Sequence, residues 1–583
     1  MKKLIGVGAA WLCAGLASGM AACSGDDNVA GTVGDASPDQ AASSDDSSIT
    51  IDTGLSGPLD AQAHNCNLGA LNGGADPVLL CSEETALLYL LQYGYQQGVG
   101  VGAGFSSQSP YAAVPQPDAP SALADNLGLV ASLGAFHCNA QYYGDNIYAA
   151  TLDGALADLV PVVSAALVAP PAGYDGELYF RMRNAALASY AIMNTGAAAA
   201  INAAADAYAR NILASYVHMV AAPPAPPPLP VDGGTEAGAG EAGPGDAGAS
   251  DAMAFGETGT VTEAGAPVDA GGAAVAVIGD LNAQNGSVSY APRQVAMAAA
   301  ALLEMASREA SKADAGVEVA ALEAAANSAL AYLWVRGRDP VTGMFYQALV
   351  TSQDPAHDAL SADATQFKYA SDALLTDVQS SIVLALARAM APAMGFAGDA
   401  GATAYGPELE ALVSSMTNAG LFNGQTTVPP MMDPTTYVPP PGAWAEGLVP
   451  SLHRTLTNQT TLSSALMLGG YVRARALGVP TSWSWEVSVI RQGLSFTTPT
   501  GGQWNANTNM ASVVTDHLGD VVQLSYLAAT SRGWGWAQAF SPTGGDAGVD
   551  PTAMSYSTAA VNSMIEGLSQ YWYEQVGMSP CAY

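Results

Sequence analysis

The sequence predicts an all-α fold of about twelve helices that pair as hairpins in a ring or a superhelix. Apolar residues recur at helical spacing in a long series of segments, separated by loops rich in Gly, Pro and aromatic residues. Many segments are Ala-rich and apolar on more than one side, which indicates helices buried between neighbours. Strand-like alternation is scarce, and no fixed short period recurs, which disfavours a regular solenoid.

The expected helices fall on both sides of a stretch rich in Pro and Gly. Those before it cover residues 83–97, 121–144, 152–167, 177–194 and 197–220. Those after it cover residues 292–311, 317–335, 376–391, 407–420, 458–478, 484–494 and 558–577, with 519–531 as an optional thirteenth. In the segment 376–391, Thr376 and Gln379 have the spacing of a capping box.

An export signal is expected at residues 1–22. Lys2 and Lys3 precede an apolar stretch that is too short and Gly-rich for a membrane span, and small residues then precede Cys23. "MAAC" (20–23) resembles the lipobox of bacterial lipoproteins. The resemblance implies that Cys23 is the acylated first residue of the mature chain, with palmitate as one modification, and that the chain goes to the outer membrane of a Gram-negative bacterium. An ordinary signal peptide is the alternative, and Cys13 is a weaker lipidation candidate.

Two segments have the composition of solvated chain. Residues 23–60 are expected to form a disordered tether, because Asp, Ser, Ala and Gly dominate its first half. Residues 223–272 are rich in Pro, Gly, Ala and acidic residues and are expected to be a disordered insertion. The same kind of helical pattern flanks this insertion, so we expect residues 61–583 to form one domain that the insertion interrupts.

The charge of the chain excludes some partners. With 17 basic and 51 acidic residues, the net charge is −34. Such a chain cannot neutralise a row of phosphates, so nucleic acid is not an expected partner. A basic patch for anionic lipid is equally unsupported.

Four further cysteines suggest two disulfides in an exported chain. They are Cys66, Cys81, Cys138 and Cys581, and three pairings remain open. If all four are oxidised, Cys581 must reach back to the N-terminal part of the fold. His64 and His137 lie beside two of these cysteines, but no recognised ligand spacing occurs, so we predict no metal site and no cofactor.

The segment "ALAYLWVRGRDPVTGMFYQALV" (329–350) contains a turn of its own, because Pro340 sets φ and Gly343 accepts a positive φ. Its Trp-x-x-x-Arg-Asp-Pro-x-Thr-Gly-x-Phe-Tyr run resembles a hairpin of the six-hairpin (α/α)₆ glycosidases, distantly the endo-α-1,6-mannanases of glycoside hydrolase family 76. The resemblance covers residues 329–389. It implies an (α/α)₆ toroid with short β-hairpins and long loops, in which the next inner helix begins with a polar residue at a central cleft.

Glycosidic hydrolysis needs two carboxyl groups. The candidates are Asp377 at a helix start, Glu446, and Asp516 in a loop with Asp520 nearby. Asp377 also suits a helix dipole, and Asp516 also suits a cap or a solvated loop. The adjacent aspartates that family 76 carries in its cleft do not occur here outside the tether, so whether the chain is an enzyme stays open.

Loop tryptophans are the candidate sugar-binding residues, because aromatic faces stack on the apolar faces of sugar rings. We single out Trp444, Trp504, Trp534 and Trp536. Packing of loops onto the helices is the competing interpretation.

Three functions are compatible with these patterns. The first is a lipid-anchored envelope protein whose domain hydrolyses polysaccharide. The second is a non-catalytic glycan-binding or scaffold lipoprotein. The third is a partner-binding helical repeat protein, which predicts an open superhelix instead of a closed ring.

Overall fold

The computed structural model describes the chain in eleven longer stretches and several short strands. The stretches are residues 83–106, 120–143, 149–167, 171–221, 274–310, 316–352, 357–363, 367–390, 405–421, 445–476 and 555–576, apart from a few single positions, and the strands lie between 494 and 540. All belong to the compact unit Ile49–Tyr583. None of the helices described here has both the length and the apolar character to cross a membrane. The expected signal, the tether, Cys23 and the insertion 223–272 lie outside the described residues.

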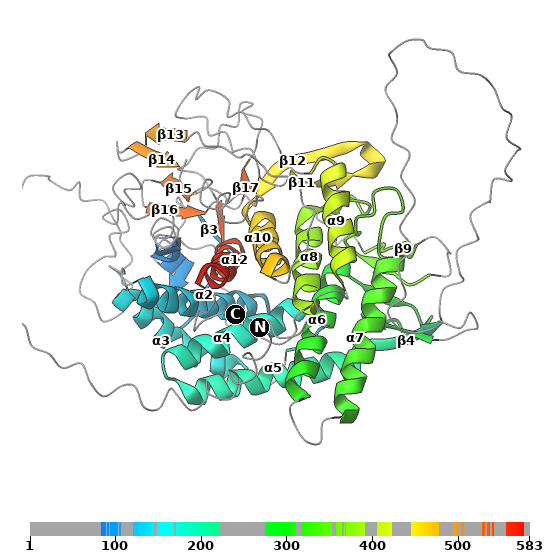
Figure 1. Ribbon diagram of the computed structural model, residues 1–583, viewed down its shortest axis with the longest axis horizontal. Helices are drawn as coiled ribbons and strands as arrows, with labels where there is room; N and C mark the ends of the chain where they lie inside the picture. Colours follow the sequence, from blue (N-terminus) through cyan, green and yellow to red (C-terminus); the bar gives the residue numbers. More distant parts are fainter. Residues whose placement is uncertain are drawn as a thin grey trace, which may run out of the picture. The chain divides into compact units, whose positions relative to one another are not determined.

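Six of the described helices pack side by side into a closed ring (Figure 1). They are α2 (Pro120–Tyr143), α4 (Gly176–Ala191), α6 (Pro292–Glu309), α8 (Thr376–Met390), α10 (Thr461–Ala476) and α12 (Thr558–Val576). Each contacts the next in this order, and α12 contacts α2. This packing explains the Ala-rich composition of the helices. Helix α6 is buried along almost its whole length, and its small side chains let the neighbouring helices approach.

Outer helices alternate with the inner ones along the chain. In the described part these are α3 (Ala149–Ala166), α5 (Thr195–Ser215), α7 (Gly316–Arg336) and α9 (Gly406–Asn418). Each contacts the inner helix that precedes it, so inner and outer helices form hairpins. The predicted all-α fold, an (α/α)₆ toroid, is confirmed. The open superhelix that a repeat protein would form is not observed. Most of the predicted helix 484–494 lies outside the described residues.

Residues from the two ends of the domain close the ring. Strand β3 (Gly104–Ser106) pairs antiparallel with β18 (Ser555–Ser557), immediately before α12. The Thr558 hydroxyl donates to the Gly102 carbonyl. Asn562 donates to the Asp125 carbonyl at 3.1 Å and accepts from the Ser132 hydroxyl at 3.1 Å. Hydrogen bonds therefore join the ends. Cys581 lies outside the described residues, so its predicted disulfide stays a prediction.

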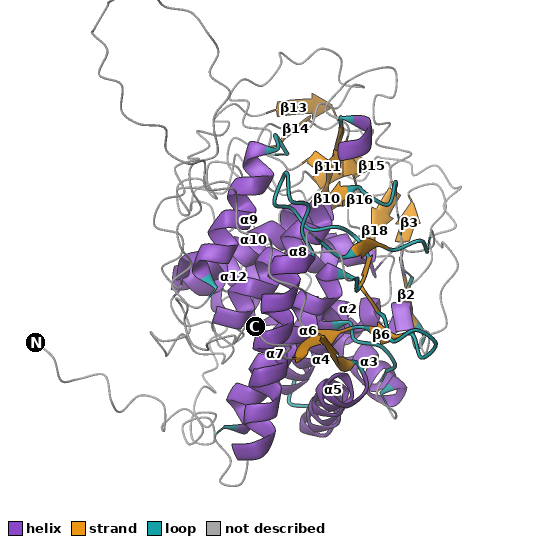
Figure 2. Cartoon of the chain, turned by 90° about the vertical axis from the view of Figure 1, so that its right-hand side faces the viewer, coloured by secondary structure: helices purple, strands orange, loops and turns teal. Residues whose placement is uncertain are grey.

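Short strands lead into four of the inner helices. These are β7 (Val288–Tyr290), β10 (Leu374–Leu375), β12 (Arg454–Thr460) and β18, which precede α6, α8, α10 and α12. One antiparallel sheet has the order β6 (Asp280–Leu281), β7, β8 (Leu349–Val350), β9 (Ala359–Leu360). Another has the order β10, β11 (Ala445–Val449), β12, β17 (Ala539–Phe540). Figure 2 shows these strands gathered along one side of the helices.

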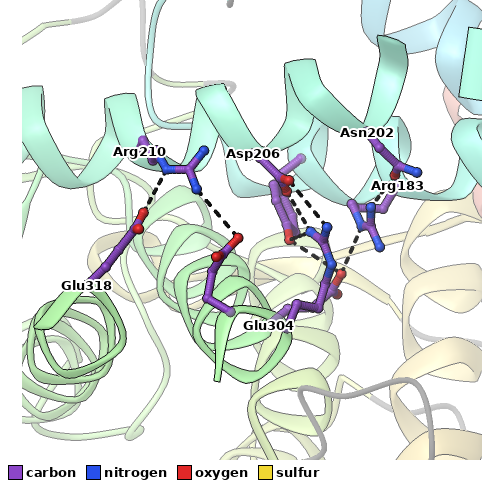
Figure 3. Close-up of polar contacts among 9 residues, drawn as sticks. Arg183, Asn202, Asp206, Arg210, Glu304 and Glu318 are labelled. Atoms are coloured by element: carbon purple, nitrogen blue, oxygen red, sulfur yellow. Dashed lines mark hydrogen bonds and ion pairs between the residues drawn. The ribbon is translucent and has the colours of Figure 1, made fainter. Parts of the chain in front are cut away.

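Two devices join the helices before the predicted insertion to those after it. Strand β4 (Val217–Ala221) pairs with β5 (Ala274–Ile278), so Ala221 lies opposite Ala274. An ionic network, drawn in Figure 3, also links α4 and α5 with α6 and α7. Its pairs are Arg183–Glu304 at 3.3 Å, Arg308–Asp206 at 2.6 Å, Arg210–Glu318 at 2.6 Å and Arg210–Glu309 at 3.5 Å.

The segment 334–346 forms the turn that its sequence predicts. Asp339 accepts hydrogen bonds from the Thr342 amide at 2.8 Å, the Thr342 hydroxyl at 2.7 Å and the Tyr346 hydroxyl at 2.9 Å. Gly343 has φ 76°, and a Cβ there would lie 2.7 Å from Ser415 Oγ of α9. Trp334 lies in the outer helix α7, and Thr376 begins the inner helix α8.

Some local predictions are wrong. The capping box does not form, because the Thr376 hydroxyl donates to the Ala445 carbonyl of β11. Gln379 instead accepts from the Phe345 amide at 2.9 Å and donates to the Phe345 carbonyl at 2.8 Å. Residues 217–220, 458–460 and 527–530, which were expected to be helical, are strands. In each case a neighbouring strand supplies hydrogen bonds that local propensity does not reveal.

A buried ionic centre lies at the end of α7. Asp358 is 0% exposed and accepts from the hydroxyls of Tyr290 and Tyr332 at 2.7 Å each. Its other oxygen accepts from Arg336 at 3.0 Å and from the Ser352 amide at 3.1 Å. These bonds join β7, α7 and the β8–β9 connection.

Asp358→Ala is predicted to lower the free energy of unfolding by about 3–5 kcal/mol, because it leaves the Arg336 charge buried without its partner. Chemical denaturation monitored by circular dichroism measures this loss. Glu318→Gln is the control, since its partner Arg210 is 47% exposed and such pairs contribute about 1 kcal/mol or less. Equal losses in the two variants would contradict the prediction.

Candidate active site

The alternation of inner and outer helices decides where the inner helices begin. Each outer helix brings the chain back to the end of the ring at which the preceding inner helix began. The first turns of α4, α6 and α8 therefore lie together at that end. Gly176 shows how closely two of them approach, because a Cβ there would lie 2.0 Å from the Met297 carbonyl carbon of α6. The amino ends of helices also carry partial positive charge, which favours carboxylates.

A carboxylate held by two arginines forms the centre of this end of the ring. Arg181 donates to Glu177 Oε1 at 2.5 Å, one turn earlier on α4. Arg293, in the first turn of α6, pairs with Glu177 Oε2. The Glu177 side chain is 15% exposed and that of Arg293 is 29% exposed, so solvent reaches this group.

A second carboxylate approaches the same guanidinium from α2. Asp125 Oδ1 lies 3.6 Å from Arg181 Nη1, which also donates to the Ala124 carbonyl at 3.0 Å. Because both carboxylates contact one guanidinium, their nearest oxygens are at most about 8 Å apart. This upper limit does not exceed the roughly 5–9.5 Å that separate the two carboxyl groups in glycosidase mechanisms.

The surroundings push the pKa values of these two carboxyl groups apart. Burial raises the pKa of Asp125 to about 6, although the Arg181 charge opposes the change. Burial alone would also raise the pKa of Glu177, but the charges of Arg181 and Arg293 outweigh it and hold the pKa at about 2. Near neutral pH, Asp125 can therefore carry and release a proton while Glu177 stays ionised.

Asp377, predicted from its place at a helix start, lies at this end. It is in the first turn of α8, where Oδ1 accepts from the Val378 amide at 2.9 Å. Its charge also acts on Arg293, where it helps to raise the pKa against the effect of burial. The structure thus brings Asp377 near the Glu177 group, although its catalytic role stays a prediction.

Glu446, the second sequence candidate, lies beside the start of α8. Strand β11 pairs with β10, with Leu375 opposite Gly447, and the Thr376 hydroxyl donates to the Ala445 carbonyl, so both neighbours of Glu446 contact the start of α8. Glu446 accepts a hydrogen bond from Tyr369, whose pKa is raised by partial burial, by this bond and by the charges of Glu446 and Asp377. Tyr369 therefore contacts Glu446, and the charge of Asp377 also acts on it.

The structure does not place the side chains of the remaining predicted catalytic and sugar-binding residues. Asp516 and Trp444 lie outside the described residues. Trp504 lies in β14 (Gln503–Ala506), and Trp534 and Trp536 lie in β16 (Gly533–Trp536); the structure describes their backbones only. Cys138 is buried in α2. Cys66 and Cys81 lie outside the described residues, so the disulfide pattern stays a prediction.

A further polar group lies deeper among the inner helices. The Arg388 guanidinium of α8 lies 3.9 Å above the Phe180 ring of α4. Glu566 of α12 has a pKa raised by burial, which the charges of Arg181 and Arg388 oppose. The interior of the ring beneath the carboxylates is therefore polar, with charge contributed by α4, α8 and α12.

Four residues of the site were not predicted from the sequence: Asp125, Glu177, Arg181 and Arg293. A signal was available, because Glu177 and Arg293 stand in the first turns of Ala-rich helices, as Asp377 does. The rule that singled out Asp377, a carboxylate at a helix start, would have found Glu177 but not Arg293. Asp125 has no comparable signal.

No group of three or more His, Cys, Asp or Glu side chains suited to a metal ion occurs among the described residues. The chemistry available in the described site is that of carboxyl groups, guanidinium groups and a tyrosine.

Comparison with known proteins adds a distant likeness. No family model and no curated protein matches the chain. An unsaturated glucuronyl hydrolase specific for heparin is 9% identical, with a TM-score of 0.47, and the match covers 86% of this chain and 98% of the other.

Two further structures are similar at lower scores. A glycoside hydrolase of family 105 from C. acetobutylicum is 10% identical, with a TM-score of 0.38, covering 78% of this chain and 95% of the other. The unsaturated glucuronyl hydrolase from Bacillus sp. GL1, responsible for the degradation of glycosaminoglycan, is 12% identical, with a TM-score of 0.36, covering 76% and 94%. None of the three is named as a family 76 enzyme. Identities and TM-scores this low assign no residue, substrate or reaction to the chain.

Proposed function

We propose that this protein is a glycoside hydrolase of the cell envelope that acts on polysaccharide. The observation that carries the proposal is the pair Asp125 and Glu177. Both contact the guanidinium of Arg181, and their pKa values are pushed in opposite directions, to about 6 and about 2. One protonated and one ionised carboxyl group are what glycosidic hydrolysis requires.

The proposed roles follow from the protonation states. Asp125, protonated below about pH 6, donates its proton to the oxygen of the departing sugar. Glu177 stays ionised and stabilises the positive charge that develops at the anomeric carbon as the C–O bond breaks. Water then adds to that carbon, and its proton passes to the Asp125 carboxylate, which restores the acid. Arg181 and Arg293 hold the Glu177 carboxylate in place.

Asp377 and Glu446 give a competing assignment of the two carboxyl roles. They lie at the same end of the ring, where the charges of both act on Tyr369. In the first assignment neither of them transfers a proton. The variants described below separate the two possibilities.

A non-catalytic glycan-binding or scaffold protein is the alternative function. The missing adjacent aspartates favour it. Under this alternative, the carboxylates and arginines would hold a glycan without cleaving it.

We also propose that the protein is anchored by lipid at Cys23, with its folded part held away from the outer membrane by the segment 23–60. The order of basic, apolar and small residues before Cys23 supports this proposal. Several acyl chains at about 0.8 kcal/mol per buried CH₂ would give a stable anchor.

Asp125→Asn and Glu177→Gln are each predicted to lower kcat by at least about 100-fold on the substrate, because they remove the proton donor and the ionised carboxylate. The substrate comes from a reducing-sugar screen of α-mannan, heparin and other glycans. Glu323→Gln, on the exposed side of outer helix α7, is the matched control and should keep full activity. A larger loss in Asp377→Asn and Glu446→Gln, with Asp125→Asn active, would instead assign catalysis to the pair predicted from sequence.

The pH profile of kcat/KM is predicted to fall as the pH rises through about 6, because Asp125 must be protonated to act as the acid. Glu177 remains ionised down to about pH 2 and adds no limb above that pH. Initial rates between pH 4 and 9 measure the profile. This range extends about two to three pH units to either side of the expected midpoint. The residual activity of Asp125→Asn should lack this limb, and its persistence there would exclude Asp125 as the acid.

Cys23→Ser is predicted to move the protein from the membrane fraction to the soluble fraction of expressing cells, because no acyl chains can be attached. Cys13→Ser is the control and should remain with the membrane. Metabolic labelling with a palmitate analogue measures the modification directly. Labelling that survives Cys23→Ser would contradict the anchor at Cys23.

A further inference from the structure

Two large aromatic side chains are exposed in the described part of the chain, Tyr190 at 46% and Tyr369 at 38%. Tyr190 lies at the carboxyl end of α4, away from the carboxylates of its first turn. Tyr369 lies on the short loop that leads into β10 and the first turn of α8. An exposed aromatic ring therefore stands at the end of the ring that carries Asp377.

The loop of Tyr369 is held at several points. The Gln347 side-chain amide donates to the carbonyls of Ala370 and Ala373 at 3.3 Å each. From the other side, Asp372 accepts from the Ser451 amide at 2.7 Å. The segment 334–347 and the connection after β11 thus fix a short loop between them, which keeps the exposed tyrosine in one place.

The hydroxyl of Tyr369 is also fixed. It donates to Glu446, which is 6% exposed, and it lies within the field of Asp377. A tyrosine anchored by its hydroxyl at a buried carboxylate leaves the faces of its ring for another contact. Leu452, 63% exposed and next to Ser451, adds apolar surface near the same loop.

We propose that Tyr369 is the sugar-binding platform of this site, where a saccharide ring lays its apolar face of C–H groups against the tyrosine. The hydrogen bonds that Gln347 and Asp372 make with the loop hold the ring in place. This inference rests on the proposed action on polysaccharide and deepens it. It assigns to Tyr369 the stacking role that we expected of the loop tryptophans.

The test compares Tyr369→Ala with Tyr369→Phe, which keeps the ring and removes only the hydroxyl. Affinity electrophoresis through gels that contain α-mannan or heparin measures binding without requiring turnover, and KM is measured where the wild-type protein is active. Tyr369→Ala is expected to weaken binding and raise KM by about five- to tenfold. Tyr369→Phe is expected to stay within about threefold of wild type, since the stacking face remains.

Tyr190→Ala is the matched control, an exposed tyrosine removed from the other end of its helix, and should bind as wild type does. Wild-type binding in Tyr369→Ala would overturn the platform while leaving the proposed function intact. An equal loss in Tyr369→Phe would overturn it too, since the hydroxyl and not the ring would then carry the effect. A wild-type protein that neither binds nor cleaves any polysaccharide overturns the proposed function and this inference together.

Discussion

Closure of the helical ring is the constraint on which the rest of the structure depends. Helix α12 packs against α2, which lies more than 400 residues earlier in the sequence. Asn562 joins the two helices both as a hydrogen-bond donor and as an acceptor. Its amide nitrogen donates to the carbonyl of Asp125, and its oxygen accepts from Ser132. The bond that closes the ring therefore also holds the backbone of the proposed acid. Gly128 lets Asn562 approach, because a Cβ there would lie 2.7 Å from its amide nitrogen.

Burial and charge act together on the site that closure creates. The interior raises the pKa of Asp125 by taking its carboxyl group out of water. Glu177 is partly buried as well, but two guanidinium groups hold its charge. One environment thus yields two protonation states, and the difference arises from how many arginines each carboxylate contacts.

The link between the helices before and after the predicted insertion serves the same site. Glu177 and Arg293 belong to α4 and α6, on opposite sides of residues 222–273 in the sequence. Pairing of β4 with β5 and the ionic network around Arg308 and Asp206 hold these helices together. The ion pair of the site therefore depends on contacts between helices that are distant in the chain.

The sequence by itself determined the helices, the turn at Asp339 and the position of Asp377, because helical periodicity, turn chemistry and helix ends are local properties. It did not reveal the strands at residues 217–220 and 458–460, whose hydrogen-bond partners lie elsewhere in the chain. Only the tertiary structure brought Asp125 beside Glu177, since periodicity shows which side of a helix is apolar and not which helix ends meet. Their protonation follows from burial and neighbouring charge, which exist only once the ring is closed.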